Sequence, residues 1–167
     1  MNFFLIKKLI SIIKIKSKKI HFHARFNAKR RTYEYLIINR PSLLSIDRGK
    51  AWHVKKKINM NILKKGGKLL KGTHDFSTFR ASSCTAKSPI KKIDSVVIKK
   101  NKEKIYIKFI SKSFLQTQVR SMVGSLKYLS TGKWSVSDFK NAMRSKNRAN
   151  CAPPAPAEGL YLVDVKY

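Results

Sequence analysis

The chain has 167 residues, and its 38 Lys and Arg against 8 Asp and Glu give a formal net charge of +30. This length fits one domain of about 100–200 residues, and 43% hydrophobic residues exclude a disordered basic tail. A run of about 18 apolar residues, as a membrane-spanning helix needs, is absent. The composition predicts a folded basic protein that binds nucleic acid, with an anionic membrane surface as the second candidate partner. Alternatively, many of the lysines simply lie on solvated faces.

Residues 1–19 form an apolar and basic leader. The stretch Met1–Ile6 resembles the start of a signal peptide, but Lys7 and Lys8 interrupt it and no small-residue cleavage site follows. Several apolar residues have partly helical spacing: Leu5, Leu9, Ile12, Ile13 and Ile20. We therefore expect an amphipathic helix packed on the rest of the domain, with binding to a membrane surface as an alternative.

Mixed patterns follow the leader. Residues 32–39 are rich in aromatic and β-branched side chains and predict a strand. Apolar spacing predicts a helix over residues 58–71, although the pair Gly66-Gly67 costs it about 1 kcal/mol per glycine. Alternating apolar residues predict a hairpin made of residues 95–98 and 104–110.

The last third of the chain predicts two helices and a strand. An apolar stripe predicts a helix over residues 115–130, and Gly132 suits its C-terminal end. Ser135 and Asp138 have the spacing of a capping box that opens a further helix. Residues 159–165 predict a final strand after a proline-rich loop. Interleaved strands and helices with hairpin pairing predict an α+β fold, an antiparallel sheet flanked by helices.

The sequence offers no cofactor motif. Its two cysteines, Cys84 and Cys151, lie far apart, which argues against a disulfide framework or a zinc ribbon and favours a reducing, cytoplasmic location. The four histidines do not pair with cysteines at ligand spacing, so we expect no metal site. The glycine-rich nucleotide-binding motifs and the Gly-x-Ser-x-Gly motif are missing too.

One segment, residues 21–35, interleaves basic and aromatic side chains. Its basic members suit contacts to phosphate: Arg25, Lys29, Arg30 and Arg31. Tyr33 follows them on the predicted strand and suits stacking on a base. A solvated basic loop beside a core tyrosine is the equally weighted alternative.

Two further segments hold candidate polar residues. In residues 72–81, short side chains around Asp75 favour a turn that Asp75 caps over a role as a catalytic acid. Arg80 is a further candidate for phosphate contact. Arg120 follows apolar Val119 at the edge of the helical stripe, so it either pairs with a buried carboxylate or points into a cleft.

The same segments carry motifs that occur together in one family. In order they are FHARF (22–26), RTYEYLI (31–37), AWHV (51–54), GTHDF (72–76), KSP (87–89), FL (114–115) with VRSMVG (119–124), and EGLYLV (158–163). Residues 20–167 thereby resemble the C-terminal α/β domain of the tRNA pseudouridine synthase A family. The resemblance implies one half of the two-lobed pseudouridine synthase fold.

The resemblance also implies an activity. It is that of a cytoplasmic, homodimeric isomerase that converts uridine to pseudouridine in the anticodon stem-loop of tRNA without a cofactor. In the family, the target base is flipped into a cleft where an aspartate acts as nucleophile. By this resemblance Arg120 pairs with that aspartate, Tyr33 stacks on the uracil, and Leu160 and Tyr161 line the pocket.

The sequence departs from the family in two places. It lacks the Arg-Thr-Asp-Ala-Gly segment that carries the nucleophile, and the leader has no family motif. Gln116 and Thr117 replace two family histidines. We therefore expect a truncated or split synthase that is inactive alone and exposes an apolar surface for a complementing N-terminal half. The alternative is a non-catalytic remnant that still binds tRNA.

Overall fold

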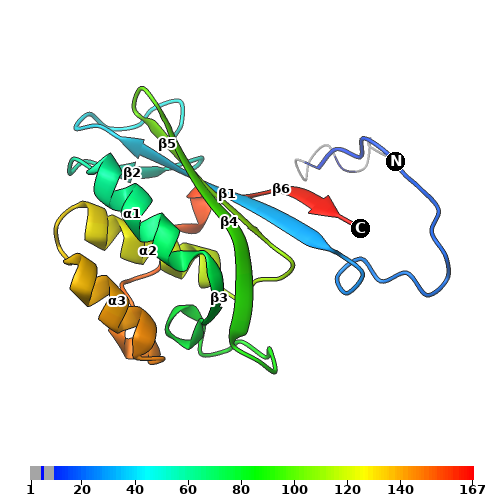
Figure 1. The fold of residues 1–167 in the computed structure, drawn as a ribbon. Helices are drawn as coiled ribbons and strands as arrows, with labels where there is room; N and C mark the ends of the chain where they lie inside the picture. Colours follow the sequence, from blue (N-terminus) through cyan, green and yellow to red (C-terminus); the bar gives the residue numbers. More distant parts are fainter. Residues whose placement is uncertain (1–4, 6–9) are drawn as a thin grey trace.

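The computed structural model describes residues 5 and 10–167 (Figure 1). Its strands are β1 (Arg30–Asn39), β2 (Trp52–Val54), β3 (Gly72–Asp75), β4 (Ile90–Asn101), β5 (Lys104–Ser111) and β6 (Leu160–Lys166). Its helices are α1 (Met60–Leu70), α2 (Gln118–Ser130) and α3 (Val136–Arg144). Short 3-10 turns lie at Ser77–Phe79, Arg148–Asn150 and Ala157–Gly159.

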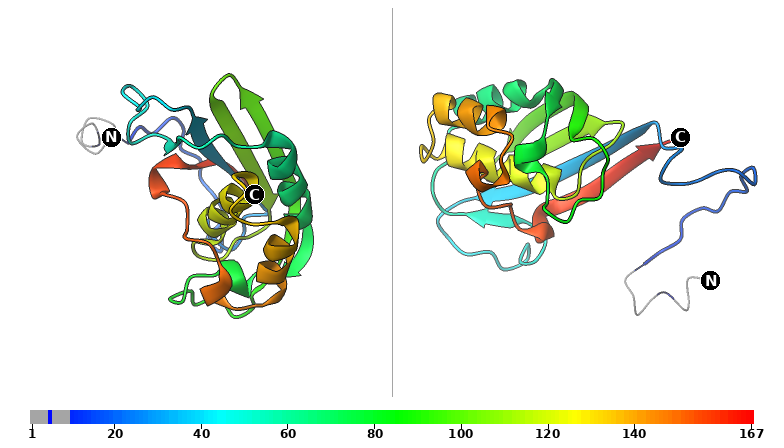
Figure 2. Two further views of the ribbon diagram at one scale, coloured as in Figure 1. Left: turned by 90° about the vertical axis from the view of Figure 1, so that its left-hand side faces the viewer. Right: turned by 90° about the horizontal axis from the view of Figure 1, so that it is seen from below.

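The central strand is β1. The sheet runs in the order β2-β1-β5-β4-β3, and β6 also pairs with β1. The pairing of β1 with β5 is antiparallel along nearly its whole length. On its other edge, the first half of β1 pairs antiparallel with β6 and its end pairs parallel with β2. The helices lie on one face of this sheet (Figure 2), which confirms the predicted α+β fold.

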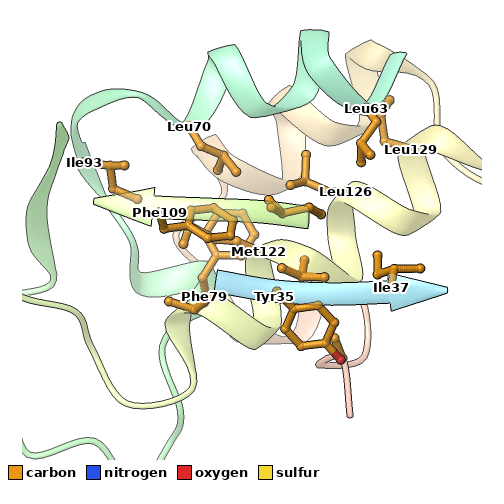
Figure 3. Close-up of a cluster of buried hydrophobic side chains, with 14 of the residues drawn as sticks. Tyr35, Ile37, Leu63, Leu70, Phe79, Ile93, Phe109, Met122, Leu126 and Leu129 are labelled. Atoms are coloured by element: carbon orange, nitrogen blue, oxygen red, sulfur yellow. The ribbon is translucent and has the colours of Figure 1, made fainter. Parts of the chain in front are cut away.

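The core lies between the sheet and the helices. Tyr35 and Ile37 of β1 alternate toward the helices and are fully buried, as the strand period requires. Figure 3 shows them among side chains of β4, β5, α1, α2 and the 3-10 turn Ser77–Phe79: Leu63, Leu70, Phe79, Ile93, Phe109, Met122, Leu126 and Leu129. Burial of each such side chain contributes about 1.5–3 kcal/mol. This packing fixes α2, and hence its first turn, against the sheet.

Two glycines bring α1 close to its neighbours. A Cβ on Gly66 would lie 2.7 Å from Cδ2 of Leu126, and one on Gly67 would lie 2.9 Å from Cδ1 of Ile98. These distances are shorter than packed carbon atoms allow, so a side chain at either position would require the Leu126 or Ile98 side chain to move. The helix predicted over residues 58–71 is confirmed as α1, and the close packing explains why it contains Gly66 and Gly67.

The leader differs from the prediction. Residues 10–19 form neither helix nor strand and run outside the body of the domain (Figure 1). Ile13 is 97% exposed and Ile20 is 93% exposed. The predicted packed helix is therefore wrong for residues 10–19, and the rest of that prediction falls on residues 1–4 and 6–9, outside the described residues. Lysines without acidic partners repel one another along a helix, and a short helix without packing is costly to nucleate.

Asp75 caps a turn, as predicted. Its Oδ1 accepts a hydrogen bond of 2.9 Å from the backbone N–H of Ser77, and Nζ of Lys146 lies 3.9 Å from its Oδ2. Hydrogen bonding from the Ser77 side chain, followed by that from its backbone, lowers the pKa of the Asp75 carboxyl below its usual value. The carboxylate therefore acts as a structural cap at the end of β3.

Replacing Asp75 by alanine is expected to lower the free energy of unfolding by about 1 kcal/mol at pH 7. Because folding lowers this pKa, the stabilisation is present above the unfolded pKa of about 4 and is lost as the pH falls through the folded value. The free energies of unfolding of the unsubstituted chain and of Asp75→Ala, measured in urea, should therefore become equal toward pH 2. The control is Asp94→Ala, which removes an exposed carboxylate on β4. A loss of stability in Asp75→Ala that persists in acid would contradict the role of Asp75 as a cap.

Candidate active-site cleft

A cleft of about 790 Å³ opens between β1, the start of α2 and the segment before β1. It brings together Tyr33, Arg120 and Leu160, which are far apart in the sequence. Its volume lies within the range of about 300–1,000 Å³ that small-molecule sites occupy. Several basic residues line it, and no acidic residue is among its lining residues. The cleft is therefore an electropositive pocket of a size that admits a nucleoside.

Tyr33 forms one wall. Its ring meets that of Phe114 edge-on, with centroids 5.2 Å apart and planes at 88°. The pairing of β1 with β6 shifts register between Thr32 and Tyr33, so Leu162 lies opposite Tyr33 and Leu160 opposite Tyr35. Such an irregularity re-aims side chains locally. Tyr33 is thus held by a neighbouring ring while one side of it borders the cleft.

Arg120 lines the same cleft from the first turn of α2. Its Nε donates a 2.6 Å hydrogen bond to the carbonyl of Ala155, and the N–H of Ala155 donates a 3.0 Å bond to the carbonyl of Arg120. This reciprocal pair ties α2 to the proline-rich loop. Only Nε of the guanidinium has a partner among the described residues, so both Nη groups are available to a group in the cleft.

Tyr35 lies near Arg120 on the core side. Its hydroxyl donates a 2.6 Å hydrogen bond to the carbonyl of Pro156. Burial raises the pKa of this hydroxyl well above its ordinary value, against an opposing effect of the Arg120 charge. Tyr35 therefore stays neutral and braces the loop that holds Arg120.

No carboxylate of this chain forms an ion pair with Arg120. All 8 acidic residues are in the described part of the chain. Their ion pairs join Asp164 to Arg30, Glu103 to Arg40, Asp47 to Lys104, Glu34 to Lys108, and Asp75 to Lys146. Of the three acidic residues without such a pair, Asp138 completes the predicted capping box with Ser135. The guanidinium that the resemblance pairs with an aspartate therefore lacks one.

Comparison with known proteins agrees with this geometry. Residues 67–167 match a family described as tRNA pseudouridine synthase. The tRNA pseudouridine synthase A of Pelagibacter ubique (strain HTCC1062) is 55% identical over 166 residues, which cover 99% of this chain and 68% of that protein. The chain belongs to the tRNA pseudouridine synthase family.

Two other relatives are covered by this chain to a similar extent. The tRNA pseudouridine synthase A of Maricaulis maris (strain MCS10) is 42% identical, over 99% of this chain and 67% of that protein. That of Caulobacter vibrioides (strain NA1000 / CB15N) is 40% identical, over 100% of this chain and 68% of that protein. The chain thus spans about two thirds of each relative, and these aligned ranges include nearly all of the leader.

The basic residues proposed for RNA contact separate into two groups. Arg25 and Arg31 line the cleft of the synthase. The two Nη groups of Arg31 donate to the backbone carbonyls of Lys112 and Arg25. Arg31 therefore braces the segment before β1 against the end of β5, and Arg25 is an exposed cation at the cleft.

The second group lies outside the cleft. Arg30 has its Nη2 3.9 Å from Asp164, and Lys29 lies exposed just before β1. Arg80 donates a 2.5 Å hydrogen bond from Nη2 to the carbonyl of Cys84 and so supports a loop that borders the cleft. The structure does not bring Lys29, Arg30 or Arg80 to the cleft itself.

Leu160 and Tyr161 point to opposite faces of β6. Leu160 lines the cleft, while the hydroxyl of Tyr161 donates to the backbone carbonyl of Lys50. This follows from the alternation of side chains along a strand. Of the two residues that the resemblance places in the pocket, the structure brings Leu160 there and not Tyr161.

Two cleft residues were not singled out as functional from the sequence. Gln118 is fully buried at the start of α2, and Thr117 before it has a left-handed backbone with φ of 64°. Gln118 could have been recognised from the sequence, because it is a polar residue next to Val119 in the apolar stripe of the helix. Because Thr117 leaves the helical conformation, α2 begins at Gln118 and not at residue 115 as predicted.

The described part of the chain contains neither a cluster of metal ligands nor a membrane-spanning helix. No three of its His, Cys, Asp or Glu side chains there gather as a metal site would require. No helix in that part of the chain has the length and apolar character needed to cross a bilayer.

Proposed function

We propose that this chain forms the wall of a cleft in which uridine of the tRNA anticodon stem-loop is converted to pseudouridine. We further propose that the reactive aspartate comes from outside its 167 residues. The observation that carries the proposal is that Arg120 and Tyr33 line one cleft while none of the chain's carboxylates forms an ion pair with Arg120.

The chemistry assigns a role to each wall. In the isomerisation the bond from C1′ to N1 breaks, a bond from C1′ to C5 forms, and the proton lost from C5 is balanced by one gained at N1. The reaction therefore consumes no further reactant, and an enzyme nucleophile can assist it. A carboxylate can serve as that nucleophile. The Arg120 cation would keep it ionised, because a nearby opposite charge favours the charged form. Tyr33 offers a ring on which the flipped uracil stacks.

Charge supports RNA as the substrate. The chain carries a net charge of +30, and Arg25, Lys91 and Lys112 border the cleft. Phosphates that such cations neutralise release counterions, which gives affinity that falls steeply with salt. A tRNA arm therefore fits this surface by charge as well as by the size of the cleft.

The exposed apolar residues of β6 favour the proposal that another segment covers this strand. Leu162 is 53% exposed and Val163 is 49% exposed, and β6 pairs only with β1 among the described strands. An exposed apolar edge strand is normally covered in a stable protein. We propose that an aspartate-bearing N-terminal half covers it, and a second copy of this chain is the alternative occupant.

Reconstitution tests the proposal. The purified chain is mixed with the separately expressed part of the Pelagibacter ubique relative that it does not cover, and pseudouridine is assayed in an unmodified tRNA transcript. We expect no conversion by the chain alone and conversion by the mixture. The control is the same complement with the aspartate that corresponds to the family's nucleophile changed to asparagine.

Each other outcome is informative. Conversion by the chain alone would disprove the need for an external aspartate. Salt-sensitive tRNA binding without conversion in the mixture would instead support the alternative of a non-catalytic tRNA-binding remnant.

A further inference from the structure

The first turn of α2 presents backbone donors without acceptors. The N–H of Gln118 donates to the carbonyl of Leu115 at 3.2 Å, and that of Ser121 donates to the carbonyl of Thr117 at 3.0 Å. Between them, the N–H groups of Val119 and Arg120 have no acceptor among the described residues. Thr117 precedes the helix but its side chain makes no capping bond. The N-terminus of α2 is therefore uncapped where it borders the cleft.

Gln118 adds a buried donor at the same place. Its side chain lines the cleft and is 0% exposed. Its Oε1 accepts a 2.7 Å hydrogen bond from the N–H of Leu115, which fixes the orientation of the carboxamide. Its Nε2 is then left buried without a partner in the described part of the chain. A buried donor left unpaired is normally selected against unless a ligand or a mechanism uses it.

The turn before α2 is also strained. Thr117 has φ of 64° and ψ of −5°, a conformation that a β-branched residue rarely adopts. The reciprocal bonds between Leu115 and Gln118 hold it there. Strain and unpaired donors in one loop that borders a cleft are typical of a ligand-binding site.

We propose that the N–H groups of Val119 and Arg120, together with Nε2 of Gln118, bind one phosphate of the RNA strand next to the target uridine. This inference rests on the proposed function. The helix dipole and free amides at a helix N-terminus favour phosphate. The Nη groups of Arg120 stay available to the aspartate, so the start of α2 would hold the backbone of the nucleotide while the guanidinium serves the reaction.

The test neutralises phosphates one at a time. Each phosphate of an unmodified anticodon stem-loop RNA is replaced by a methylphosphonate, and the Kd is measured for this chain and for Gln118→Glu. The glutamate keeps an acceptor for Leu115 but removes the donor. Asn61→Asp makes the same amide-to-carboxylate change on the exposed side of α1 and is the matched control.

We expect one phosphate whose neutralisation weakens binding to the unsubstituted chain and to Asn61→Asp by about 10-fold. The same change should weaken binding to Gln118→Glu by less than about 2-fold, because the glutamate removes one donor and its negative charge repels the phosphate from the two backbone N–H groups that remain. Identical profiles for all three proteins would overturn the inference.

A second measurement needs no variant. In the ¹⁵N-labelled chain, the amide signals of Val119 and Arg120 should shift on addition of the stem-loop and shift much less with the RNA neutralised at that phosphate. Equal shifts with both RNAs would overturn the inference even if Gln118→Glu fails to fold. Failure of the unsubstituted chain to bind the stem-loop would count against the proposed function itself, whereas binding without these responses would remove only the phosphate site.

Discussion

Gly124→Ala is expected to lower the free energy of unfolding by about 3 kcal/mol or more. Gly124 lies in the interior of α2, where helix propensity alone would make alanine more stable by about 1 kcal/mol. A Cβ at this position, however, would lie 2.0 Å from the carbonyl oxygen of Pro153. This atom is backbone and cannot turn aside, so α2 and the proline-rich loop would have to separate. Urea unfolding followed by circular dichroism measures the loss.

Gly132→Ala is the control for this prediction. Gly132 has φ of 76° but nothing within 4 Å of the position of a Cβ. Alanine there should cost only about 1 kcal/mol, from backbone strain without a clash. Equal losses at the two positions, or a stabilised Gly124→Ala protein, would show that the loop does not restrain α2.

Arg120→Lys is expected to lower the rate of pseudouridine formation by the reconstituted enzyme more than about 100-fold, which corresponds to about 2.7 kcal/mol of transition-state stabilisation. Lysine keeps the charge but loses the Nε–H bond to Ala155 and the forked pairing with a carboxylate. The affinity for tRNA should change less than about threefold. Single-turnover conversion and filter binding measure the two quantities separately.

The control for Arg120 is Lys64→Met. Lys64 lies exposed on α1 and is not among the residues that line the cleft, so the conversion rate should stay unchanged. If Arg120→Lys kept the conversion rate, the role assigned to the guanidinium would be disproved. Loss of tRNA affinity alone would make Arg120 an RNA contact.

The sequence predicted correctly those helices and strands whose patterns lie within the element itself. The β-branched run that became β1 and the Ser135 capping box of α3 are set by residues close in the sequence. The short strands β2 and β3 were not predicted, because three or four residues hold no period and their pairing partners lie elsewhere in the chain. The start of α2 was misplaced for a similar reason, since the left-handed Thr117 depends on the bonds between Leu115 and Gln118.

The cleft was predictable in part. Family motifs pointed to Tyr33, Arg120 and Leu160, and the structure places all three around one cleft. The bracing role of Arg31 could not be predicted, because it depends on two backbone carbonyls that tertiary folding brings near its guanidinium. A basic residue in a sequence looks the same whether its partner is a phosphate or the protein's own backbone.

The exposed strand β6 and the charge of +30 together determine how this molecule behaves in different buffers. At low ionic strength, mutual repulsion keeps separate copies from docking through their uncovered Leu162 and Val163. Concentrated salt shortens the range of that repulsion to a few ångströms. We therefore expect strand-to-strand aggregation of the chain to increase at high salt, where a segment that covers β6 would protect it most.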